Sequence, residues 1–438
     1  MKEPTLIRAR WVVPVAPAGA VLEDHAVVVR EGAIEAVLPA AEALARHPGA
    51  PLTDLPAHAL IPGLVNAHTH AAMSLMRGLA DDLPLMRWLE DHIWPAEMKH
   101  VSPQFVKDGT LLACAEMLRG GVTCMNEMYF FPEAAVEATL ECGMRAAIGM
   151  IVIEFPSAYA ADPDDYLAKG LAVRDRYREH PLASFCLAPH APYTVSDASF
   201  RKIATLAGEL DCPVHIHVHE TREEIERSVA EHGVRPLERL HRLGLLGPNL
   251  ISVHSVHLNP EEIALLGRHR ASIAHCPSSN LKLASGFSPV AALAAAGANI
   301  AIGTDGAASN NRLDMFQELR TAALLAKAVA NDAAALPAHA ALRAATLGGA
   351  VALGLDARIG SIEAGKAADL TAVRLDALEL SPLFDPVSQL VYAAGREHVS
   401  HVWVAGRPAV IEGNLQHSTF SGLDSRWKLW QNSLRMHV

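Results

Sequence analysis

The sequence predicts an α/β fold: a (β/α)8 barrel of the TIM type, with a small β-sandwich domain built from both chain ends. Its 438 residues suit a barrel of about 250 residues plus a smaller unit. Between residues 58 and 360, short apolar segments alternate with helical ones, which is typical of a parallel sheet. The two ends of the chain instead carry short strand-like segments separated by turns.

The two ends are predicted to form one domain because they share this β-rich pattern. Residues 1–57 contain strands rich in Val and Ile, and Glu31-Gly32 favours a hairpin turn. Residues 361–422 lead into a similar run at 399–407. The remaining tail, residues 423–438, is expected to be a terminal helix that docks through Trp427 and Trp430.

The middle segment contains eight candidate strands, and eight strand-helix units imply a closed barrel. The strands are expected at Leu60–Asn66, Val122–Glu127, Arg145–Ile151, Ala183–Ala188, Val214–Val218, Leu250–His254, Ser272–His275 and Ile300–Thr304. Helical patterns are expected at Ser102–Arg119, Glu133–Glu141, Ser196–Leu210, Glu223–Glu231 and Pro260–Leu266. In such a barrel, functional groups gather at the carboxyl ends of the strands.

The bulk composition argues against several classes of partner. The net charge is −11 with both signs interspersed, whereas nucleic acids and anionic membranes select a basic face. The longest strongly apolar run, Ala146–Ile153, is too short to span a bilayer, and the N-terminus lacks the layout of a signal peptide. The six cysteines form no C-x-x-C pair, which favours a reducing compartment and hence the cytoplasm.

Histidines and an acid follow nearly every predicted strand, which a purely structural barrel does not require. In chain order they are His68 and His70, His190, then His215, His217 and His219, then His254, His275 and Asp305. A single barrel histidine is more often a hydrogen-bonded core residue than a ligand. His275 is interpreted as a packing residue, but coincidences at the other five strand ends multiply, so the joint pattern favours a functional site.

Two of these histidines, His68 and His70, are two positions apart, and a strand places such residues on the same face. With 23 histidines in the chain, this spacing is expected about once by chance. Three imidazoles and one carboxylate suit a catalytic Zn²⁺, and these ligand types also admit Fe²⁺ or Mn²⁺. The residues that best fill the set are His68, His70, His217 and Asp305. The strand period alone leaves His215 and His219 on the same face as His217.

Two acids near the predicted ligands have alternative interpretations. Glu220 lies three residues past His217, just beyond the fifth predicted strand, where it could shuttle protons. It could equally begin the next helix, because acids favour first helical turns. Asp305 taken alone could be a turn residue before Gly306, which is a common use of Asp-Gly.

Three runs of the sequence carry a family resemblance: Pro62–His70, Ser278–Leu283 and Gly303–Asn311. The first resembles the opening signature of the amidohydrolase superfamily, and the order His-x-His, His, His, Asp matches it over essentially the whole chain. The other two resemble the 5′-methylthioadenosine/S-adenosylhomocysteine deaminases within that superfamily. No lysine ends the fourth predicted strand to bridge two metal ions, so a mononuclear site is expected.

The resemblance implies the catalytic roles. The residues that match the metal ligands are His68, His70, His217 and Asp305. Glu220 matches the acid that protonates the purine ring and shuttles protons to the leaving ammonia. His254 matches the histidine that positions the nucleophilic water, which the metal and Asp305 help to deprotonate.

The resemblance also implies the substrate contacts. Glu97 matches the carboxylate that holds both ribose hydroxyls, and His190 matches a group that hydrogen-bonds the purine. Trp88 matches an aromatic beside the substrate, and Ser309 lies in the third run and is counted with the substrate-binding residues. Without the resemblance, Glu97 would be interpreted as a solvated acid on a helix and Trp88 as a core residue.

The third predicted strand departs from the family pattern. Members that act well on S-adenosylhomocysteine carry arginines after this strand, for the amino-acid carboxylate. Here Met150 stands where one such arginine would fall, and residues 154–166 contain no arginine. This departure favours a small apolar 5′ group, as in methylthioadenosine, or plain adenosine. Met150 could pack on a methylthio group.

The predicted function is therefore metal-dependent hydrolytic deamination of an adenine nucleoside, giving the inosine analogue and ammonia. One alternative is an aminohydrolase or chlorohydrolase of another heterocycle, such as guanine, cytosine or a triazine. Another is a non-catalytic barrel that serves as a scaffold. The resemblance also leans toward a homo-oligomer.

Overall fold

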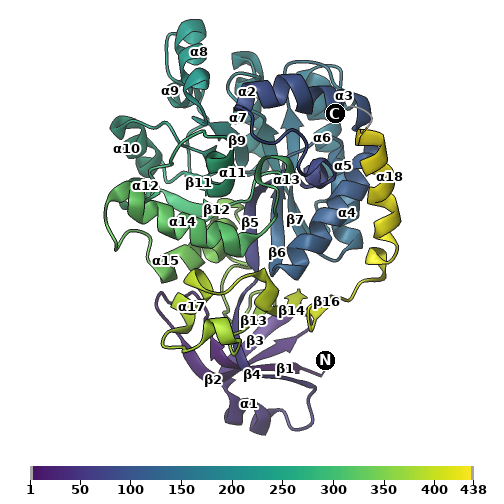
Figure 1. The fold of residues 1–438 in the computed structure, drawn as a ribbon, viewed down its shortest axis with the longest axis vertical. Coiled ribbons are helices and arrows are strands. Elements are labelled where there is room, and N and C mark those ends of the chain that lie inside the picture. The colour runs from purple at the N-terminus through teal and green to yellow at the C-terminus, as the bar shows by residue number, and fades with distance from the viewer. Residues whose placement is uncertain (1–2, 436–438) are drawn as a thin grey trace.

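The computed structural model describes residues 3–435, and two sheets organise them into a barrel and a smaller β unit beneath it (Figure 1). The barrel sheet has eight strands, and each pair of neighbours is parallel. Its strands are β5 (Leu64–Thr69), β6 (Val122–Glu127), β7 (Arg145–Val152), β8 (Ala183–Pro189), β9 (Val214–Val218), β10 (Leu250–His254), β11 (Ser272–His275) and β12 (Asn299–Ile302). The predicted α/β barrel is confirmed.

The first predicted strand, Leu60–Asn66, is wrong in one respect, because it is divided between the two sheets. β4 (Leu52–Pro62) pairs within the small sheet, and the barrel strand begins at Leu64. Gly63 stands at the break, where a Cβ would lie 2.1 Å from Thr123 Oγ1 of β6. A residue with a side chain cannot approach β6 this closely, so the Pro-Gly pair marks the change of sheet.

Side chains join the last barrel strand to the first. Asn66 Nδ2 donates to Thr304 Oγ1 at 2.8 Å, and Thr304 N donates to Asn66 Oδ1 at 3.0 Å. One residue further on, Asp305 N donates to the carbonyl of His68 at 3.0 Å. These contacts bring the ends of β5 and β12 together, and with them two of the predicted metal ligands.

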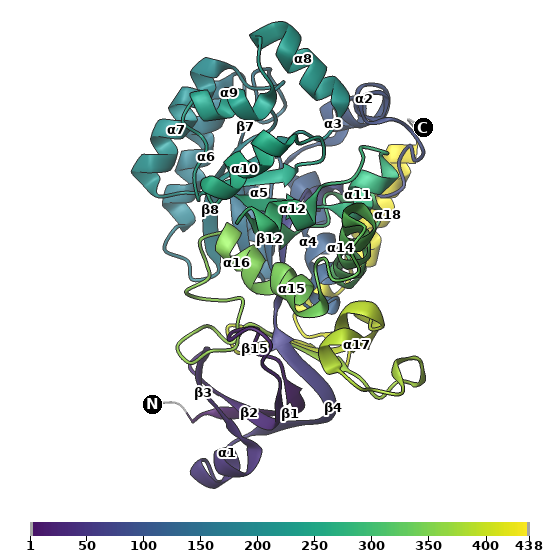
Figure 2. The same cartoon turned by 90° about the vertical axis from the view of Figure 1, so that its left-hand side faces the viewer.

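Helices cover the outside of the barrel (Figure 2). The main ones are α4 (Pro103–Arg119), α5 (Pro132–Glu141), α6 (Pro163–Tyr177), α7 (Asp197–Leu210), α8 (Arg222–His232), α9 (Pro236–Arg242), α10 (Pro260–Arg268), α12 (Val290–Ala295) and α14 (Met315–Ala330). The five predicted helices are confirmed to within two residues at each end. Two of them start one residue late because Ser102 and Ser196 are N-caps, which accept from Phe105 N and Ser199 N.

Short helices complete the barrel and its loops. Between β5 and α4 lie η1 (Ala71–Met76), α2 (Leu85–Trp88), the π-helical turn η2 (Leu89–Ile93) and α3 (Trp94–His100). Beyond β11 follow α11 (Pro277–Lys282), α13 (Ala307–Asn310), α15 (Ala338–Arg343), η3 (Ala344–Gly348) and α16 (Gly349–Ala352). No described helix is both long and apolar enough to cross a membrane.

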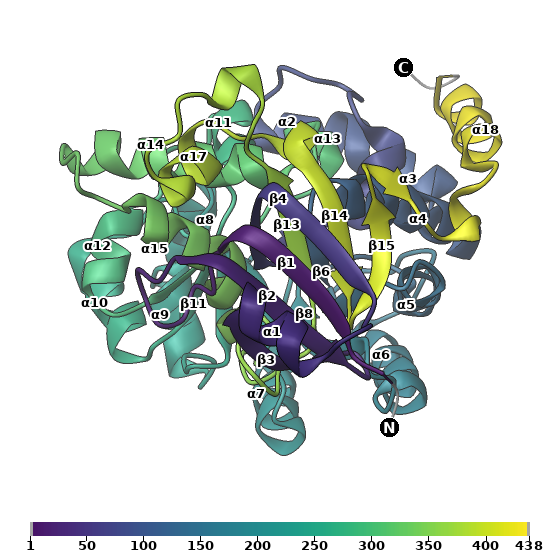
Figure 3. The same ribbon diagram turned by 90° about the horizontal axis from the view of Figure 1, so that it is seen from below.

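The small unit draws its strands from both ends of the chain, as predicted. They follow one hydrogen-bonded order, β16-β15-β14-β13-β4-β1-β2-β3, which is visible from below in Figure 3. Besides β4 they are β1 (Thr5–Val12), β2 (Leu22–Arg30), β3 (Ala33–Pro39), β13 (Leu370–Arg374), β14 (Val399–Val404), β15 (Arg407–Ile411) and β16 (Asn414–Leu415). Its helices and turns are α1 (Ala40–Arg46), η4 (Leu378–Leu380), α17 (Pro386–Tyr392) and η5 (Arg396–His398). The antiparallel pair β4–β13 joins the two ends of the chain.

The tail follows the turn η6 (Ser418–Phe420) and forms the helix α18 (Leu423–Arg435), which lies against α4 (Figure 1). Trp430 supplies the contact: its Nε1 donates to Asp108 Oδ2 at 3.0 Å, and its ring lies 5.1 Å from that of Phe105. Trp427 is partly buried against the same core. The last predicted tail residues, 436–438, lie outside the described part of the chain.

Candidate active site

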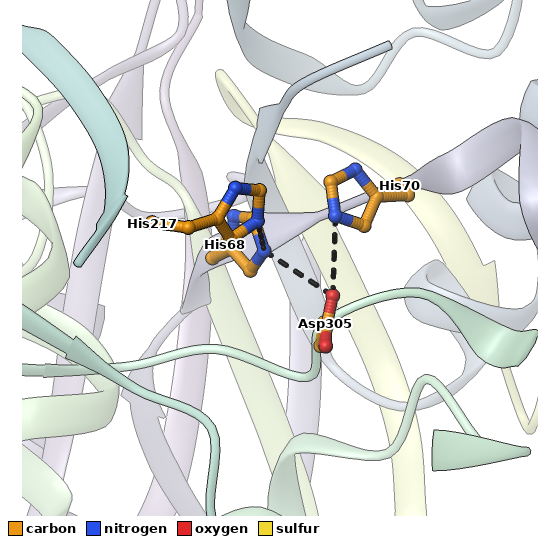
Figure 4. A group of neighbouring side chains, drawn as sticks. All are labelled: His68, His70, His217 and Asp305. Atoms are coloured by element: carbon orange, nitrogen blue, oxygen red, sulfur yellow. Dashed lines mark hydrogen bonds and ion pairs between the residues drawn. The ribbon is translucent and has the colours of Figure 1, made fainter. Parts of the chain in front are cut away.

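Four predicted ligands converge at the carboxyl end of the barrel (Figure 4). One ligand atom from each of them lies within 4.8 Å of the others; the four are His68, His70, His217 and Asp305. Asp305 Oδ1 lies 3.2 Å from Nε2 of both His68 and His70. The Nε2 atoms of His68 and His217 are also only 3.2 Å apart.

The Nδ1 atoms of these histidines point away from the cluster and make hydrogen-bond contacts outside it. His70 Nδ1 donates to the carbonyl of Met128 at 2.6 Å, and His217 Nδ1 donates to the carbonyl of His190 at 2.7 Å. A ring that donates through Nδ1 carries a bare Nε2 in its neutral form, which is the form that binds a metal ion. His68 Nδ1 lies 2.8 Å from Nε2 of His215, which is fully buried. These outer contacts are of the kind that orient metal-binding histidines, so the donor set fits a cation.

The protonation of the cluster follows from burial and from one carboxylate. Burial lowers the pKa of His68 to about 4 and places that of His217 well below its usual value. Burial also opposes protonation of His70, but the hydrogen bond and charge of Asp305 outweigh it and raise the pKa of His70 to about 9. Burial raises the pKa of Asp305, yet hydrogen bonds with His68 and His70 hold it well below the usual range. An ionised carboxylate beside imidazole nitrogens is a site that attracts a cation.

Asp305 is held on both of its oxygens. Oδ2 accepts from Ser279 Oγ at 2.6 Å and from Ser309 Oγ at 2.8 Å, while Oδ1 accepts from Gly306 N. Asp305 has a φ of 61°, a left-handed backbone that is uncommon outside glycine. Ser309, which was predicted to contact substrate, lines the cavity, but its hydroxyl is engaged by this carboxylate.

Glu220 and His254 face each other beside the cluster. His254 Nε2 lies 3.7 Å from Glu220 Oε2, and His254 Nδ1 lies 2.8 Å from Asn280 Oδ1. Burial raises the pKa of Glu220, and the neighbouring His254 only partly opposes this shift. Ser285 Oγ donates to Glu220 Oε1 at 3.5 Å. A buried acid whose protonated form is favoured, beside a histidine, can take part in proton transfer.

Glu220 is also secured through its backbone. Its N–H donates to Glu224 Oε2 at 2.8 Å, and the N–H of His219 donates to Glu224 Oε1 at 3.0 Å. Glu224 belongs to the first turn of α8, so the helix that Glu220 was alternatively expected to begin starts at Arg222. The structure therefore leaves the Glu220 side chain free to line the cavity.

A cavity of about 430 Å³ opens over the cluster. Its volume falls in the range of small-molecule sites. The predicted substrate residues Trp88, Glu97 and His190 line it, together with the metal-ligand candidates His70, His217 and Asp305. His190 Nδ1 lies 3.0 Å from Thr194 Oγ1, which leaves its Nε2 as the atom available to a ligand. Burial lowers the pKa of His190 to about 3, so it is neutral.

Met150 is the predicted substrate residue that the structure places elsewhere. It does not line the cavity: its side chain packs against Gly170 of α6, on the helical side of β7. Ile151 and Ile153 line the cavity instead. Side chains alternate between the two faces of a strand, and the sequence alone did not show which face of this fully buried strand looks inward.

The structure decides between the three histidines of the fifth strand. His217 supplies Nε2 to the cluster. His215 lies against His68 as its outer partner. His219 follows the end of β9 with a φ of 58°, and its ring accepts from Leu237 N and contacts the carbonyl of His257. The chain therefore leaves the strand geometry between His217 and His219, which a strict period of two cannot show.

Tyr129 is a cavity residue that sequence reasoning missed. It lies two residues after the end of β6, is 5% exposed, and donates from its hydroxyl to Glu97 Oε1 at 2.6 Å. The signal that could have found it is its place just past a barrel strand, the rule that selected the histidines. Glu127, the last residue of β6, is also buried; burial raises its pKa to about 8, and its Oε2 accepts from Ala71 N.

Comparison with known proteins identifies the family of this chain. The model of the amidohydrolase family matches residues 59–409. The chain belongs to the amidohydrolase family. A 5-methylthioadenosine/S-adenosylhomocysteine deaminase from Teredinibacter turnerae is 48% identical, and the match covers 97% of this chain and 96% of that protein.

Two solved structures share the fold of this chain. An adenosine deaminase from Xanthomonas campestris, with bound zinc, is 54% identical over 99% of this chain and 98% of its own, with a TM-score of 0.97. An atrazine chlorohydrolase from Arthrobacter aurescens covers 98% of this chain and 100% of its own with a TM-score of 0.91. Its sequence is only 24% identical, so that likeness concerns the fold alone.

Proposed function

We propose that this amidohydrolase is a metal-dependent deaminase of adenine nucleosides, which it converts to the inosine analogue and ammonia. The observation that carries the proposal is one cavity that joins the ligand cluster to two further carboxylates, the buried Glu220 and the partly buried Glu97. The names of the relatives from Teredinibacter turnerae and Xanthomonas campestris support the same reaction. We propose 5′-methylthioadenosine or adenosine as the preferred substrate over S-adenosylhomocysteine.

One divalent ion, Zn²⁺ by preference, is the proposed cofactor. The residues that would hold it are His68, His70, His217 and Asp305. Zinc in the Xanthomonas campestris structure supports this choice, since that protein is 54% identical. Such an ion supplies Lewis acidity and lowers the pKa of a water molecule toward neutrality.

Glu220 is proposed as the general acid–base. Burial raises its pKa, which favours the protonated form, so it can protonate the purine ring while water attacks C6. The attacking water loses two protons: Glu220 can pass one to the departing amino group, which leaves as ammonia, and keep the other, which restores its protonated form. His254 lies 3.7 Å from Glu220 and is oriented by Asn280, so it can hold the attacking oxygen in line.

Glu97, His190 and Trp88 are proposed to bind the nucleoside. A carboxylate can accept one hydrogen bond from each hydroxyl of a cis-diol, and bonds to a charged acceptor are the stronger kind. Glu97 is therefore assigned to the ribose. His190 presents Nε2 to the purine, and the buried Trp88 packs beside it.

The 5′ end of the substrate is expected to meet an apolar wall. Met98 follows Glu97 on α3, lines the cavity and is 76% exposed, so it lies at the opening. Phe155 is also exposed at this opening, with its ring 6.4 Å from that of Trp94. No lysine or arginine is among the described residues that line the cavity. A methylthio group fits this surface, whereas the charged amino-acid tail of S-adenosylhomocysteine finds no cation there.

A spectrophotometric screen tests the proposal. The metal-loaded enzyme is offered adenosine, 5′-methylthioadenosine, 5′-deoxyadenosine and S-adenosylhomocysteine, with guanine and cytosine as free-base comparisons. We expect loss of the adenine absorbance with the first three and a lower kcat/KM with S-adenosylhomocysteine. If the adenine absorbance does not fall with any of the four nucleosides, the proposal is contradicted.

A variant of Glu97 distinguishes nucleoside substrates from the alternative heterocycles. A free base or a triazine has no ribose for Glu97 to hold, so Glu97→Ala should abolish nucleoside turnover and spare such a substrate. The complete ligand cluster with Glu220 argues against a non-catalytic scaffold, which has no need of it. A scaffold would also bind no stoichiometric metal.

The compartment and the oligomeric state stay predictions. All six cysteines are buried and free, which supports a reducing compartment such as the cytoplasm. A homo-oligomer is proposed from the family resemblance alone, and light scattering of the purified chain tests it.

A further inference from the structure

Glu97 sits on a short helix above the barrel. It belongs to α3, which follows the π-helical turn η2 and lies at the carboxyl end of the barrel, away from the small sheet (Figure 1). Among the hydrogen bonds described for residues 85–98, the bond to Tyr129 is the one that reaches the barrel. A glutamate side chain without such a partner loses considerable rotamer freedom when a ligand fixes it.

Tyr129 is itself firmly placed. Met128, directly before it, donates from its N–H to the carbonyl of Thr69 at 3.0 Å and accepts from His70 Nδ1 at 2.6 Å. The Tyr129 ring lies 5.4 Å from that of Phe130 and 6.4 Å from that of His70. Its position is therefore fixed by the same backbone that orients one of the proposed metal ligands.

The hydrogen bond runs from the tyrosine to the carboxylate. Tyr129 OH lies 2.6 Å from Glu97 Oε1, and both side chains line the cavity. A carboxylate has about four lone-pair sites on two oxygens, so one bond from Tyr129 leaves room for two ribose hydroxyls. The bond thus fixes the rotation of the carboxylate while keeping its capacity to bind a diol.

We propose that Tyr129 is a positioning residue that orients Glu97 and so determines recognition of the ribose hydroxyls. The inference rests on the proposed function, because it assigns Tyr129 a role only through Glu97. It predicts that the Tyr129 hydroxyl acts on substrate binding and not on the chemical step, which takes place at Glu220 and the ligand cluster. The bond also favours the ionised form of Glu97, whose pKa burial raises to about 7.

The test compares Tyr129→Phe with the wild type, both as metal-loaded enzyme, on adenosine and on 2′,3′-dideoxyadenosine. The substitution keeps the ring and removes only the hydroxyl. We expect KM for adenosine to rise roughly tenfold or more, the usual worth of a hydrogen bond to a charged group. The kcat on adenosine should stay within about threefold, and neither constant should change for the dideoxy substrate.

Two further variants complete the design. Tyr159→Phe is the matched control, because Tyr159 OH is buried without a hydrogen-bond partner among the described residues and does not line the cavity. It should leave both substrates unaffected. In a Glu97→Ala background, which removes the acceptor of the bond, Tyr129→Phe should add little to the loss of adenosine binding, since the two residues act through one bond.

The outcomes separate the inference from the function. If Tyr129→Phe lowers kcat/KM equally for adenosine and 2′,3′-dideoxyadenosine, or if it loses bound metal, Tyr129 has a merely structural role and the inference is overturned. An unchanged KM for adenosine would overturn it as well, while the proposed function would stand. If the wild-type enzyme deaminates no adenine nucleoside at all, the proposed function fails, and the inference fails with it.

Discussion

At the scale of single residues, this site depends on acids whose charge is set by the balance between burial and hydrogen-bond partners. Asp305 stays ionised because two histidines and two serine hydroxyls surround it. Glu220 and Glu97 have few such partners, so burial raises the pKa of both. A carboxyl group can therefore bind a cation at one position and carry a proton at another.

Glu220→Gln tests the proton-transfer role. The amide keeps the size of the side chain and cannot shuttle a proton, so kcat should fall by about 10²–10⁴. Metal content, measured by atomic absorption, should stay near one ion per chain. Glu226→Gln, at an exposed position of α8, is the control and should behave as the wild type. Near-normal turnover by Glu220→Gln with metal bound would refute the mechanism.

The ionisation of Glu97 predicts a pH dependence of substrate binding. Its carboxylate accepts two hydrogen bonds only when ionised, and its pKa is about 7 because burial outweighs the bond from Tyr129. A bound divalent ion near His70 lowers that value further, so the midpoint should lie at or below pH 7. KM for adenosine should therefore rise as the pH falls through this midpoint. KM for 2′,3′-dideoxyadenosine, measured in parallel, should not follow the same curve.

At the scale of elements, the closure of the barrel between β12 and β5 positions the ligands. Asn66 and Thr304 join the two strands, and Asp305 N binds the carbonyl of His68. Gly303 makes this approach possible, since a Cβ there would lie 2.8 Å from His68 N. A side chain at position 303 has no space, because the nearest atoms belong to the backbone of His68 and cannot move aside as a flexible side chain could.

Gly303→Ala should therefore separate His68 from Asp305. We expect a clear loss of metal affinity and of kcat/KM, with helix content by circular dichroism close to wild type. Gly208→Ala is the control: Gly208 lies in α7, a Cβ there would meet nothing within 4 Å, and alanine favours a helix. Full metal binding by Gly303→Ala would show that the strand ends do not set the ligand geometry.

At the scale of the whole molecule, the barrel and the small sheet are joined by a buried ion pair. Arg145 stands at the start of β7. Its Nε lies 2.8 Å from Asp369 Oδ2, and both side chains are almost fully buried. Asp369 Oδ1 also accepts from Ala405 N in the small sheet. The pair therefore links three segments far apart in the sequence, on the side of the barrel that faces the small sheet.

Removal of one partner should destabilise the molecule. Asp369→Ala leaves the guanidinium of Arg145 buried without its counter-ion, which typically costs about 3–5 kcal/mol. A lower midpoint of urea unfolding, followed by fluorescence, is the expected result. Asp376→Ala is the control, because its pair with Arg374 is exposed and should contribute little. Equal midpoints for the two variants would show that the buried pair does not hold the units together.

Much of this molecule could be predicted from the sequence because the relevant signals are local. Strand-helix alternation and apolar runs predicted eight barrel strands, seven of them within two residues of their observed ends, while the first was divided between the two sheets. The rule that function gathers at strand ends selected His68, His70, His217 and Asp305 before any geometry was known. The failures concern orientation: Met150 faces a helix, because a strand buried on both sides gives no pattern to tell its faces apart.

The sequence by itself determined the fold class, the order of the strands and the strand ends that supply the candidate ligands, since periodicity and strand ends are properties of short segments. Only the tertiary structure decided between His215, His217 and His219, because the chain bends away from strand geometry after Val218. It also brought Tyr129 to Glu97, 32 residues away in the chain. Contacts between distant segments depend on how the whole barrel closes, which no short window of sequence contains.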